Sequence, residues 1–350
     1  MDETKVKSLI DRVIADRGGS FVVALAYVGD RLGLFRAMHG TGPLTSEALA
    51  RRAGLNERYV REWLKGMVAA EYLEYDPGAD AYSMTEEQGS VLADEASKTY
   101  LGGVFQLPMA SFQHMPRFLE VFRDGGGLSY AELGDEIVEA HDRSHRSPFE
   151  HSLVQDWLPQ VDGLEAKLHA GAEILDVGCG LGRSSLVMAR AYPRSRVHGL
   201  DADPQAIRGA RASAEEAGVD NLEFLNLPIG DLPPDAAYDF IFAFDCIHDM
   251  ADPLGALKAI RGGLEPDGVF VWSELNASND PLENRNPVGR MISAISPFHC
   301  LTVSLAYGGM GLGNMLGESG VRELAIQAEF SQCEKLPIKT ALQQFFALRP

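Results

Sequence analysis

The chain has 350 residues, of which 45% are hydrophobic and 23% are charged, a balance that indicates a globular protein rather than a disordered one. It carries 31 Lys and Arg residues against 50 Asp and Glu residues, so its formal net charge is −19. This acidity argues against nonspecific binding to nucleic acid or to an anionic membrane, because both require basic side chains. The length is sufficient for two domains.

The cysteines and the apolar runs indicate the compartment. The four cysteines, Cys179, Cys246, Cys300 and Cys333, form no Cys-x-x-Cys pair. The sequence MDETKVKSLIDRV at the start lacks the apolar core of a signal peptide, and the longest apolar runs are shorter than the ~20 residues of a membrane span. We therefore expect a cytoplasmic protein with reduced thiols and no membrane partner.

The first part of the chain is predicted to be helical. Residues 1–17 are predicted to form one helix and residues 20–38 a second, with Ser20 as its N-cap. The second helix is apolar on more than one face, which is typical of a helix buried in a core or between subunits.

The segment that follows has the pattern of a winged helix-turn-helix. Helices are predicted over residues 46–52 and 57–70, and two short strands then flank an Asp-Pro-Gly turn. A helix that reads DNA needs a basic face, but Glu57 and Glu62 accompany the basic residues of the second helix. Acidic residues also outnumber basic ones over residues 1–95. We therefore expect a packing and dimerisation module that does not bind nucleic acid.

The middle of the chain is predicted to be a helical linker that covers the active site, over residues 96–172. Three consecutive glycines, Gly125, Gly126 and Gly127, indicate a flexible joint within it. No Glu follows His141, as the helical H-E-x-x-H zinc motif would require.

From residue 173 onward strands and helices alternate, which predicts a doubly wound α/β sheet. Seven strands are expected, over residues 173–177, 196–200, 221–225, 238–244, 268–274, 331–337 and 342–348. The predicted organisation is therefore a winged-helix dimerisation domain over 1–95, the linker over 96–172 and an α/β domain over 173–350.

The first predicted strand of this sheet ends in a glycine-rich turn. Gly178, Gly180 and Gly182 follow a short apolar run, and glycine permits both a sharp turn and the close approach of a ligand. The dinucleotide fingerprint G-x-G-x-x-G would place its third glycine at Arg183, and a phosphate loop would need Gly-Lys-Ser/Thr. Asp201 ends the second strand, where an acid accepts hydrogen bonds from ribose hydroxyls.

The pattern L-D-V-G-C-G-x-G, with D-x-D after the second strand, resembles motif I of the class I S-adenosylmethionine (SAM) methyltransferases. The resemblance covers the C-terminal half and implies a Rossmann-like seven-stranded methyltransferase sheet with SAM as cofactor. In that family an Asp after the third strand bonds the adenine amino group, but Leu227, Pro228 and Ile229 stand here, with Gly230-Asp231 as an alternative register. The implied cofactor-binding residues are Asp176, Gly178, Cys179, Gly180, Gly182, Asp201, Ala202, Pro228, Ile229, Phe244 and Asp245.

The sequence FDCIHDM follows the fourth predicted strand and carries the candidate base. His248 followed by Asp249 resembles the His-Asp-Trp motif of two-domain O-methyltransferases, in which this His is the general base, although Met250 replaces the Trp. In the same enzymes a Glu at the end of the fifth strand orients the His, and Glu274 occupies that place. We predict His248 and Glu274 as the catalytic pair; a His that only shapes the pocket is the alternative.

A long insertion over residues 276–318 is predicted to be a lid or a wall of the substrate site. His299 lies in it, and we expect His299, Tyr130 and His151 to line the ligand pocket. The sequence leaves open whether several residues of metal-ligating types converge, and we expect no bound metal; these are Cys246, His248, Asp249, His299 and Cys300.

The combination of these motifs with a winged N-terminal domain resembles two-domain methyltransferases first known from mycobacteria. That resemblance implies a homodimer and a closed pocket for a small-molecule acceptor, which we predict to be methylated at oxygen. Two alternatives remain from the residues themselves, a SAM-sensing winged-helix transcription regulator and a nicotinamide-dependent oxidoreductase.

Overall fold

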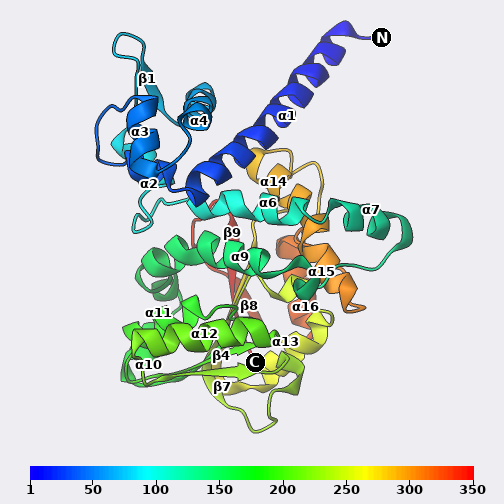
Figure 1. Cartoon of the computed structure of the whole chain (residues 1–350). Helices are drawn as coiled ribbons and strands as arrows, with labels where there is room; N and C mark the ends of the chain where they lie inside the picture. The colour runs from blue at the N-terminus through cyan, green and yellow to red at the C-terminus, as the bar shows by residue number, and fades with distance from the viewer. The chain divides into compact units, whose positions relative to one another are not determined.

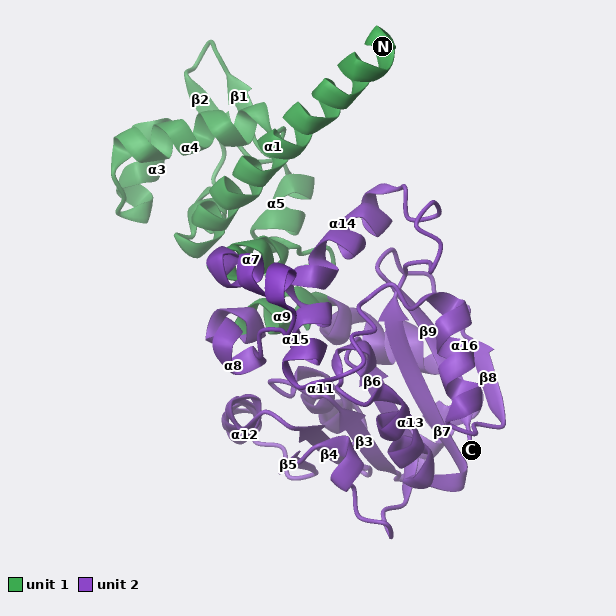
Figure 2. Cartoon of the chain, turned by 90° about the vertical axis from the view of Figure 1, so that its right-hand side faces the viewer, with its two compact units in different colours: residues 1–113, 139–147 green, residues 114–138, 148–350 purple.

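The computed structural model describes residues 1–350 and divides into two compact units (Figure 2). Unit 1 comprises residues 1–113 and 139–147, and unit 2 comprises residues 114–138 and 148–350. The segment predicted as a linker, residues 96–172, contributes residues to each unit. No helix is both long enough and apolar enough to span a membrane.

Unit 1 contains the predicted helix-turn-helix and its wing. Its elements up to residue 113 are α1 (Glu3–Arg31), α2 (Leu34–Met38), α3 (Ser46–Ala53), α4 (Glu57–Ala69), β1 (Glu74–Asp76), β2 (Ala81–Ser83), α5 (Glu86–Leu92), η1 (Gly102–Phe105) and α6 (Gln106–Phe112). Side chains of Thr45 and Asn56 accept hydrogen bonds from the first turns of α3 and α4, and so fix where both helices begin. The antiparallel β1–β2 pair forms the wing.

The prediction of two helices at the start of the chain was wrong. A single helix, α1, runs from Glu3 to Arg31 (Figure 1, blue). Gly18 and Gly19 stay helical, because a glycine costs only about 1 kcal/mol relative to Ala and does not itself break a helix. The helix ends before Gly33, whose φ of 70° lies in the left-handed region that glycine adopts readily.

The two ends of α1 differ in burial. Near its C-terminal end Trp63 of α4 donates a hydrogen bond to the Leu25 carbonyl (3.0 Å), and a Cβ on Gly29 would lie 2.5 Å from the Trp63 ring. Asp30 is buried and pairs with Arg143 (2.7 Å). The N-terminal half instead exposes an apolar stripe to solvent, formed by Val6, Leu9, Ile10, Val13 and Ile14.

Unit 2 is built on the predicted seven-stranded sheet. Its strands are β3 (Glu173–Val177), β4 (Arg196–Asp201), β5 (Leu222–Asn226), β6 (Tyr238–Phe244), β7 (Leu264–Leu275), β8 (Gln332–Lys335) and β9 (Gln343–Arg349). Their order is β5-β4-β3-β6-β7-β9-β8. The first five are parallel, and β9 pairs antiparallel with both β7 and β8. The strand order reverses between β3 and β6, which is where open α/β sheets bind ligands.

Alternate residues of the central strands pack on opposite faces of this sheet. On one face Leu175, Ile241 and Phe270 join a core with α13 (Pro253–Gly262) and α16 (Gly317–Gln327). On the other face Ile174, Phe240 and other residues pack with α10 (Leu164–Ala170), α11 (Arg183–Ala191) and the π-helix η2 (Phe149–Trp157). The helix α12 (Pro204–Ala217) packs on β4 and β5.

The remaining elements of unit 2 precede or follow the strands in the chain. Before the sheet these are α7 (Met115–Asp124), α8 (Tyr130–Leu133), the first turn of α9 (Asp135–Pro148) and η3 (Leu158–Gln160); after its strands come η4 (Ile229–Asp231), η5 (Ile247–Asp249), α14 (Pro287–Ile295), η6 (Ser296–Phe298) and α15 (Cys300–Ala306). The predicted insertion over 276–318 therefore contains the helices α14, η6 and α15, joined by irregular segments.

Candidate active site

The turn between β3 and α11 has the backbone that its glycines predict. Gly178, Gly180 and Gly182 have φ values of 71°, 54° and 77°, all in the left-handed region. A Cβ on Gly178 would lie 2.7 Å from the Cys246 sulfur, and one on Gly182 would lie 2.4 Å from the Phe224 ring. These two glycines are therefore required by close packing as well as by conformation.

Asp176 lies just before this turn and faces into the protein. It is buried, and its Oδ2 accepts hydrogen bonds from Ser184 (2.6 Å) and Ser185 (2.5 Å) on the first turn of α11. Burial raises the pKa of Asp176 to about 7, although the two serines act in the opposite direction. Asp176 thus ties the strand to the helix that follows the turn, and the serines are partners that the motif alone did not identify.

Asp201 ends β4 and lies beside the same turn. Its Oδ2 accepts a hydrogen bond from the Gly180 amide (2.9 Å), and its Oδ1 accepts one from the Asp203 amide (2.9 Å). Burial raises the pKa of Asp201 above its ordinary value, against these backbone donors. The carboxylate is therefore fixed at the strand end where the sequence predicted a ribose contact.

The other predicted cofactor-binding residues are less uniform in their placement. Ala202 and Pro228 are exposed, whereas Ile229 is buried in the hydrophobic core beneath η4. Phe244 joins an aromatic cluster with Phe149 and Trp157 of the π-helix. The Ile229 side chain is thus already packed in the core.

Asp245 and Cys246 follow β6 and are held by neighbouring strands. Asp245 has a positive φ of 50°, and its carboxylate accepts hydrogen bonds from Ser273 (2.8 Å) and Gln343 (3.0 Å). The thiol of Cys246 donates to the Val177 carbonyl (3.2 Å), so it lies under the glycine turn. Together they fix the direction in which the chain leaves β6 for η5.

His248 and Glu274 are brought together as predicted, at the ends of adjacent parallel strands. Both are 1% exposed, and His248 Nδ1 lies 2.6 Å from Glu274 Oε2. The other carboxylate oxygen of Glu274 accepts a hydrogen bond from the Trp272 indole (2.9 Å). Trp272 was not anticipated, although its position two residues before Glu274 places both side chains on the same face of β7.

Asp249 lies on the opposite side of the imidazole. Its Oδ1 is 3.3 Å from His248 Nε2, and its Oδ2 accepts a hydrogen bond from the Tyr130 hydroxyl (3.1 Å). Burial opposes a charge on His248, but Glu274 and Asp249 outweigh it and raise the pKa of His248 well above its ordinary value. The two carboxylates therefore stabilise the imidazolium form.

Tyr130 and His299 meet at this carboxylate. The Tyr130 hydroxyl is 3.3 Å from His299 Nε2, and this nitrogen is 3.7 Å from Asp249 Oδ2. Burial lowers the pKa of His299, and the neighbouring Asp249 only partly compensates. Burial also raises the pKa of Tyr130 well above its ordinary value, and Asp249 adds to that shift. Two of the three predicted substrate-facing residues thus join the His248 cluster.

The segment before α8 explains how Tyr130 reaches the cluster. The Leu128 amide donates to the Thr302 hydroxyl of α15 (2.9 Å), and a Cβ on Gly127 would lie 1.9 Å from the Thr302 carbonyl oxygen. Gly127 therefore serves close packing against α15, not only the flexible joint that we predicted.

The third predicted residue, His151, belongs to a different element of unit 2, the π-helix η2. It is half-buried on the π-helix η2, which packs against α11, and its Nε2 is buried without a hydrogen-bond partner. π-Helical turns are rare and often occur at functional sites. The structure gives His151 no bond to the cluster around His248.

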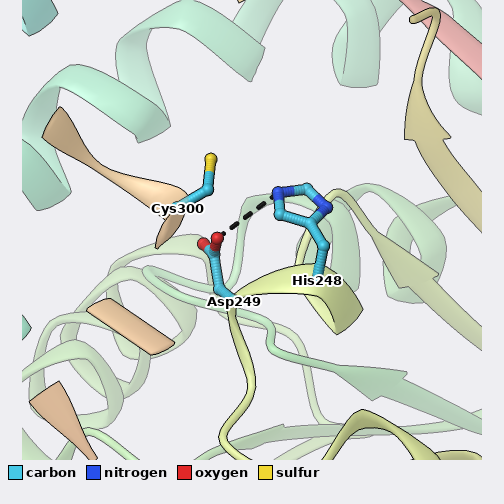
Figure 3. Close-up of side chains that lie close together, drawn as sticks. All are labelled: His248, Asp249 and Cys300. Carbon is cyan, nitrogen blue, oxygen red and sulfur yellow. Dashed lines mark ion pairs between the residues drawn. The ribbon is translucent and has the colours of Figure 1, made fainter. Parts of the chain in front are cut away.

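Cys300 begins α15 and completes the cluster. Figure 3 shows it beside Asp249, which faces His248 across their ion pair. The ligating atoms of His248, Asp249 and Cys300 all lie within 4.8 Å of one another. Burial raises the pKa of the Cys300 thiol to about 12, and Asp249 adds to that shift. The convergence that the sequence left open therefore exists for three of the five residues of metal-ligating types.

Two family models match the chain. Residues 168–307 match the methyltransferase domain, and residues 20–94 match the Rv2258c-like winged HTH domain. A ubiquinone biosynthesis O-methyltransferase from Acinetobacter baylyi is 30% identical over 134 residues, which are 38% of this chain and 52% of that protein. The chain thus spans about half the length of the curated relatives it matches.

Solved structures resemble the chain along its whole length. Human N-acetylserotonin methyltransferase in complex with SAM has a TM-score of 0.70 and 18% identity, with 97% of each chain covered. An O-methyltransferase family protein from Burkholderia thailandensis has a TM-score of 0.69 and 16% identity, covering 100% of this chain and 98% of that one. At these identities the likeness establishes the fold. The chain therefore joins a winged helix-turn-helix domain to a methyltransferase domain of the SAM-dependent class I fold.

Proposed function

We propose that the chain is a SAM-dependent methyltransferase that acts on a small-molecule acceptor at oxygen, with His248 as the general base. The observation that carries this proposal is the Trp272–Glu274–His248 chain of hydrogen bonds at the ends of β6 and β7. The proposed SAM site is the glycine turn after β3, which lies at the point where the strand order reverses.

The residues at the glycine turn fit SAM. The carboxylate of Asp201 is fixed by backbone amides and has further lone pairs for ribose hydroxyls, while the turn at Gly178 to Gly182 leaves no side chain at Gly180. When bound, SAM supplies an activated methyl group on a sulfonium centre. The protein then has to align the acceptor with that methyl group and remove the acceptor's proton.

Proton removal is assigned to Nε2 of His248 in its neutral form; because the neighbouring carboxylates raise the pKa of this imidazole, we expect turnover to increase with pH. Its Nδ1 is engaged by Glu274, which fixes the tautomer and the orientation of the ring. When Nε2 accepts a proton, Glu274 and Asp249 stabilise the imidazolium that forms, as the orienting carboxylate of a catalytic triad does. Nε2 faces Asp249 and Cys300, so the acceptor's hydroxyl is placed on this side of the ring.

Tyr130 and His299 are proposed to contact the acceptor. Both are polar, both lie within hydrogen-bonding reach of each other, and both border the Asp249 carboxylate. Methylation at oxygen draws further support from the similar proteins, which include ubiquinone biosynthesis O-methyltransferases and a mitomycin 7-O-methyltransferase.

We also infer a cytoplasmic homodimer. All four cysteines are free thiols, which suits a reducing compartment. The apolar stripe of Val6, Leu9, Ile10, Val13 and Ile14 on α1 offers a face for a second copy of the chain. Light scattering after gel filtration tests the dimer: the Leu9→Glu, Val13→Glu double variant should run as a monomer, and a wild-type monomer would contradict the inference.

The test of the enzymatic proposal is a turnover assay of the full chain with SAM against a library of small hydroxyl, amine and thiol compounds. Formation of S-adenosylhomocysteine should depend on one chemical class of acceptor. Isothermal titration separates this function from that of an oxidoreductase, because S-adenosylhomocysteine should bind and NAD should not. Binding of NAD alone would refute the proposal.

A SAM-sensing transcription regulator remains the second candidate because of the winged helix-turn-helix match. The charges of α4 weigh against it. Arg58 and Lys65 pair with Glu62, and Arg61 pairs with Glu57 and Glu47, so the would-be recognition helix offers little uncompensated positive charge. Salt-dependent binding to duplex DNA would favour the regulator.

A further inference from the structure

We propose that His248, Asp249 and Cys300 form a binding site for a divalent transition metal, with Zn²⁺ as the preferred ion. The three residues offer one imidazole nitrogen, one carboxylate oxygen and one sulfur within 4.8 Å of one another (Figure 3). This donor set suits Zn²⁺, whereas Mg²⁺ and Ca²⁺ prefer oxygen ligands alone. The site goes beyond the proposed methyl transfer, because metal binding does not depend on it.

The spacing of the ligand atoms is close to what zinc requires. With metal–nitrogen and metal–sulfur distances of about 2.0 and 2.3 Å, neighbouring ligands of a tetrahedral ion lie roughly 3.3–3.8 Å apart. His248 Nε2 and Asp249 Oδ1 are already 3.3 Å apart. The Cys300 sulfur lies within 4.8 Å of the other two ligand atoms, so it is the ligand that would have to approach.

The surroundings support each ligand separately. Nδ1 of His248 is held by Glu274, and Glu274 is held by Trp272, which is the carboxylate–histidine arrangement that orients metal-bound imidazoles. Asp249 uses Oδ2 to accept from Tyr130, which leaves Oδ1, an atom that is buried without a hydrogen bond, to face the ion. One carboxylate oxygen of Asp249 thus binds Tyr130, and the other is assigned to the metal ion.

The charge and burial of the cluster also favour a cation. His248 is 1% exposed, Cys300 4%, and the Asp249 side chain 11%. Without a metal, the ion pair with His248 compensates the buried Asp249 carboxylate, and a divalent ion bound to neutral His248 would take over that role. Three protein ligands would leave a fourth position free, as in catalytic zinc sites.

Metal binding at this site would exclude His248 as the general base of the proposed function. A bound Zn²⁺ would occupy Nε2 of His248, the atom to which the proposed function assigns the acceptor's proton. The ion itself lowers the pKa of a hydroxyl or thiol placed beside it, and so would replace the base. This last step rests on the proposed function, whereas the binding site rests on the geometry alone.

The experiment measures metal binding by the full chain, freed of any affinity tag and kept reduced. After dialysis against ZnCl₂ we expect one Zn²⁺ per chain by elemental analysis, and Co²⁺ substitution should give a thiolate-to-cobalt charge-transfer band. Cys300→Ser should lose that band and weaken Zn²⁺ binding by more than about 100-fold, because losing even an outer partner of a ligand costs about 10–100-fold.

Two controls keep the result interpretable. Cys333→Ser changes a half-buried thiol on β8, outside the cluster, and should bind Zn²⁺ and Co²⁺ as the wild type does. Titration with S-adenosylhomocysteine shows that Cys300→Ser is folded, and Asp249→Asn provides a second ligand variant if it is not. Wild-type affinity for Zn²⁺ in both ligand variants, or a cobalt spectrum without a thiolate band, would overturn the site whether or not the chain transfers methyl groups.

Discussion

The glycine turn after β3 and the cluster around His248 lie on the same sheet but are constructed in different ways. The turn is local: Gly178, Gly180, Gly182 and Asp201 come from one strand–turn–helix–strand unit, and backbone amides hold its carboxylate. The cluster gathers side chains from α8, η5, β7 and α15, which are far apart in the sequence. The glycine turn is therefore held by backbone conformation, whereas the cluster around His248 is held by buried charge.

The largest expected effect is on the cluster. His248→Ala should lower turnover by about 10²–10⁴-fold, the range for loss of a general acid or base, and leave the affinity for S-adenosylhomocysteine nearly unchanged. The two quantities are measured by steady-state kinetics and titration calorimetry. His198→Ala, a half-buried His on β4, is the matched control and should keep its turnover. Full activity of His248→Ala would show that His248 is not the general base.

A pH experiment examines the buried charge beside the turn. The pKa of Asp176 is raised to about 7 from 3.8, so the folded state keeps a proton that the unfolded state has lost over this interval. The stability from this group is fully present below about pH 4 and is lost as the pH rises through about 7, a change of about 4 kcal/mol. In Asp176→Asn the free energy of unfolding should lack this pH-dependent contribution, because Asn does not ionise.

The measurement for Asp176 is urea unfolding at a series of pH values. As the pH rises from 4 to 8, the unfolding free energy of the wild type should fall relative to that of Asp176→Asn. Asp220→Asn, on an exposed loop before β5, should instead give a curve parallel to that of the wild type. A constant difference for Asp176→Asn would show that Asp176 ionises normally.

The conformational character of the turn can be tested with two alanine substitutions. Gly182→Ala places a Cβ 2.4 Å from the Phe224 ring at a positive φ, so we expect a loss of about 2–4 kcal/mol in unfolding free energy. Gly180→Ala has a positive φ but meets no atom within 4 Å, so only the conformational cost of about 1–2 kcal/mol should appear. Equal losses in thermal or urea unfolding would contradict the packing argument.

A positioning effect is expected for Trp272→Phe, which keeps an aromatic ring and removes the indole donor to Glu274. Since a hydrogen bond to a charged group contributes about 1.5–3 kcal/mol, turnover should fall roughly 10–100-fold. As Trp272 positions Glu274 and does not touch the acceptor, kcat should fall with little change in KM. Phe270→Leu removes the ring that stacks on Trp272 but keeps the indole donor, so it should lower kcat less than Trp272→Phe does.

Much of the fold was predictable, because its signals are local. Strand alternation in unit 2 predicted all seven strands, and caps such as Asn56 placed the starts of helices in unit 1. The break predicted near Gly18 was wrong, because glycine weakens a helix without ending it. The surrounding fold decides whether the chain turns at a glycine, and the local sequence does not contain that information.

The site divides in the same way. The sequence by itself determined the glycine turn and Asp201, whose positions follow from strand ends on one parallel sheet, and the resemblance to two-domain O-methyltransferases added the His248–Glu274 pair. Only the tertiary structure decided that Tyr130 and Cys300 join His248, that Trp272 supports Glu274, and that His151 lies on η2 against α11. The reason is physical: a strand period fixes neighbours within a sheet, whereas the convergence of loops and short helices depends on long-range packing.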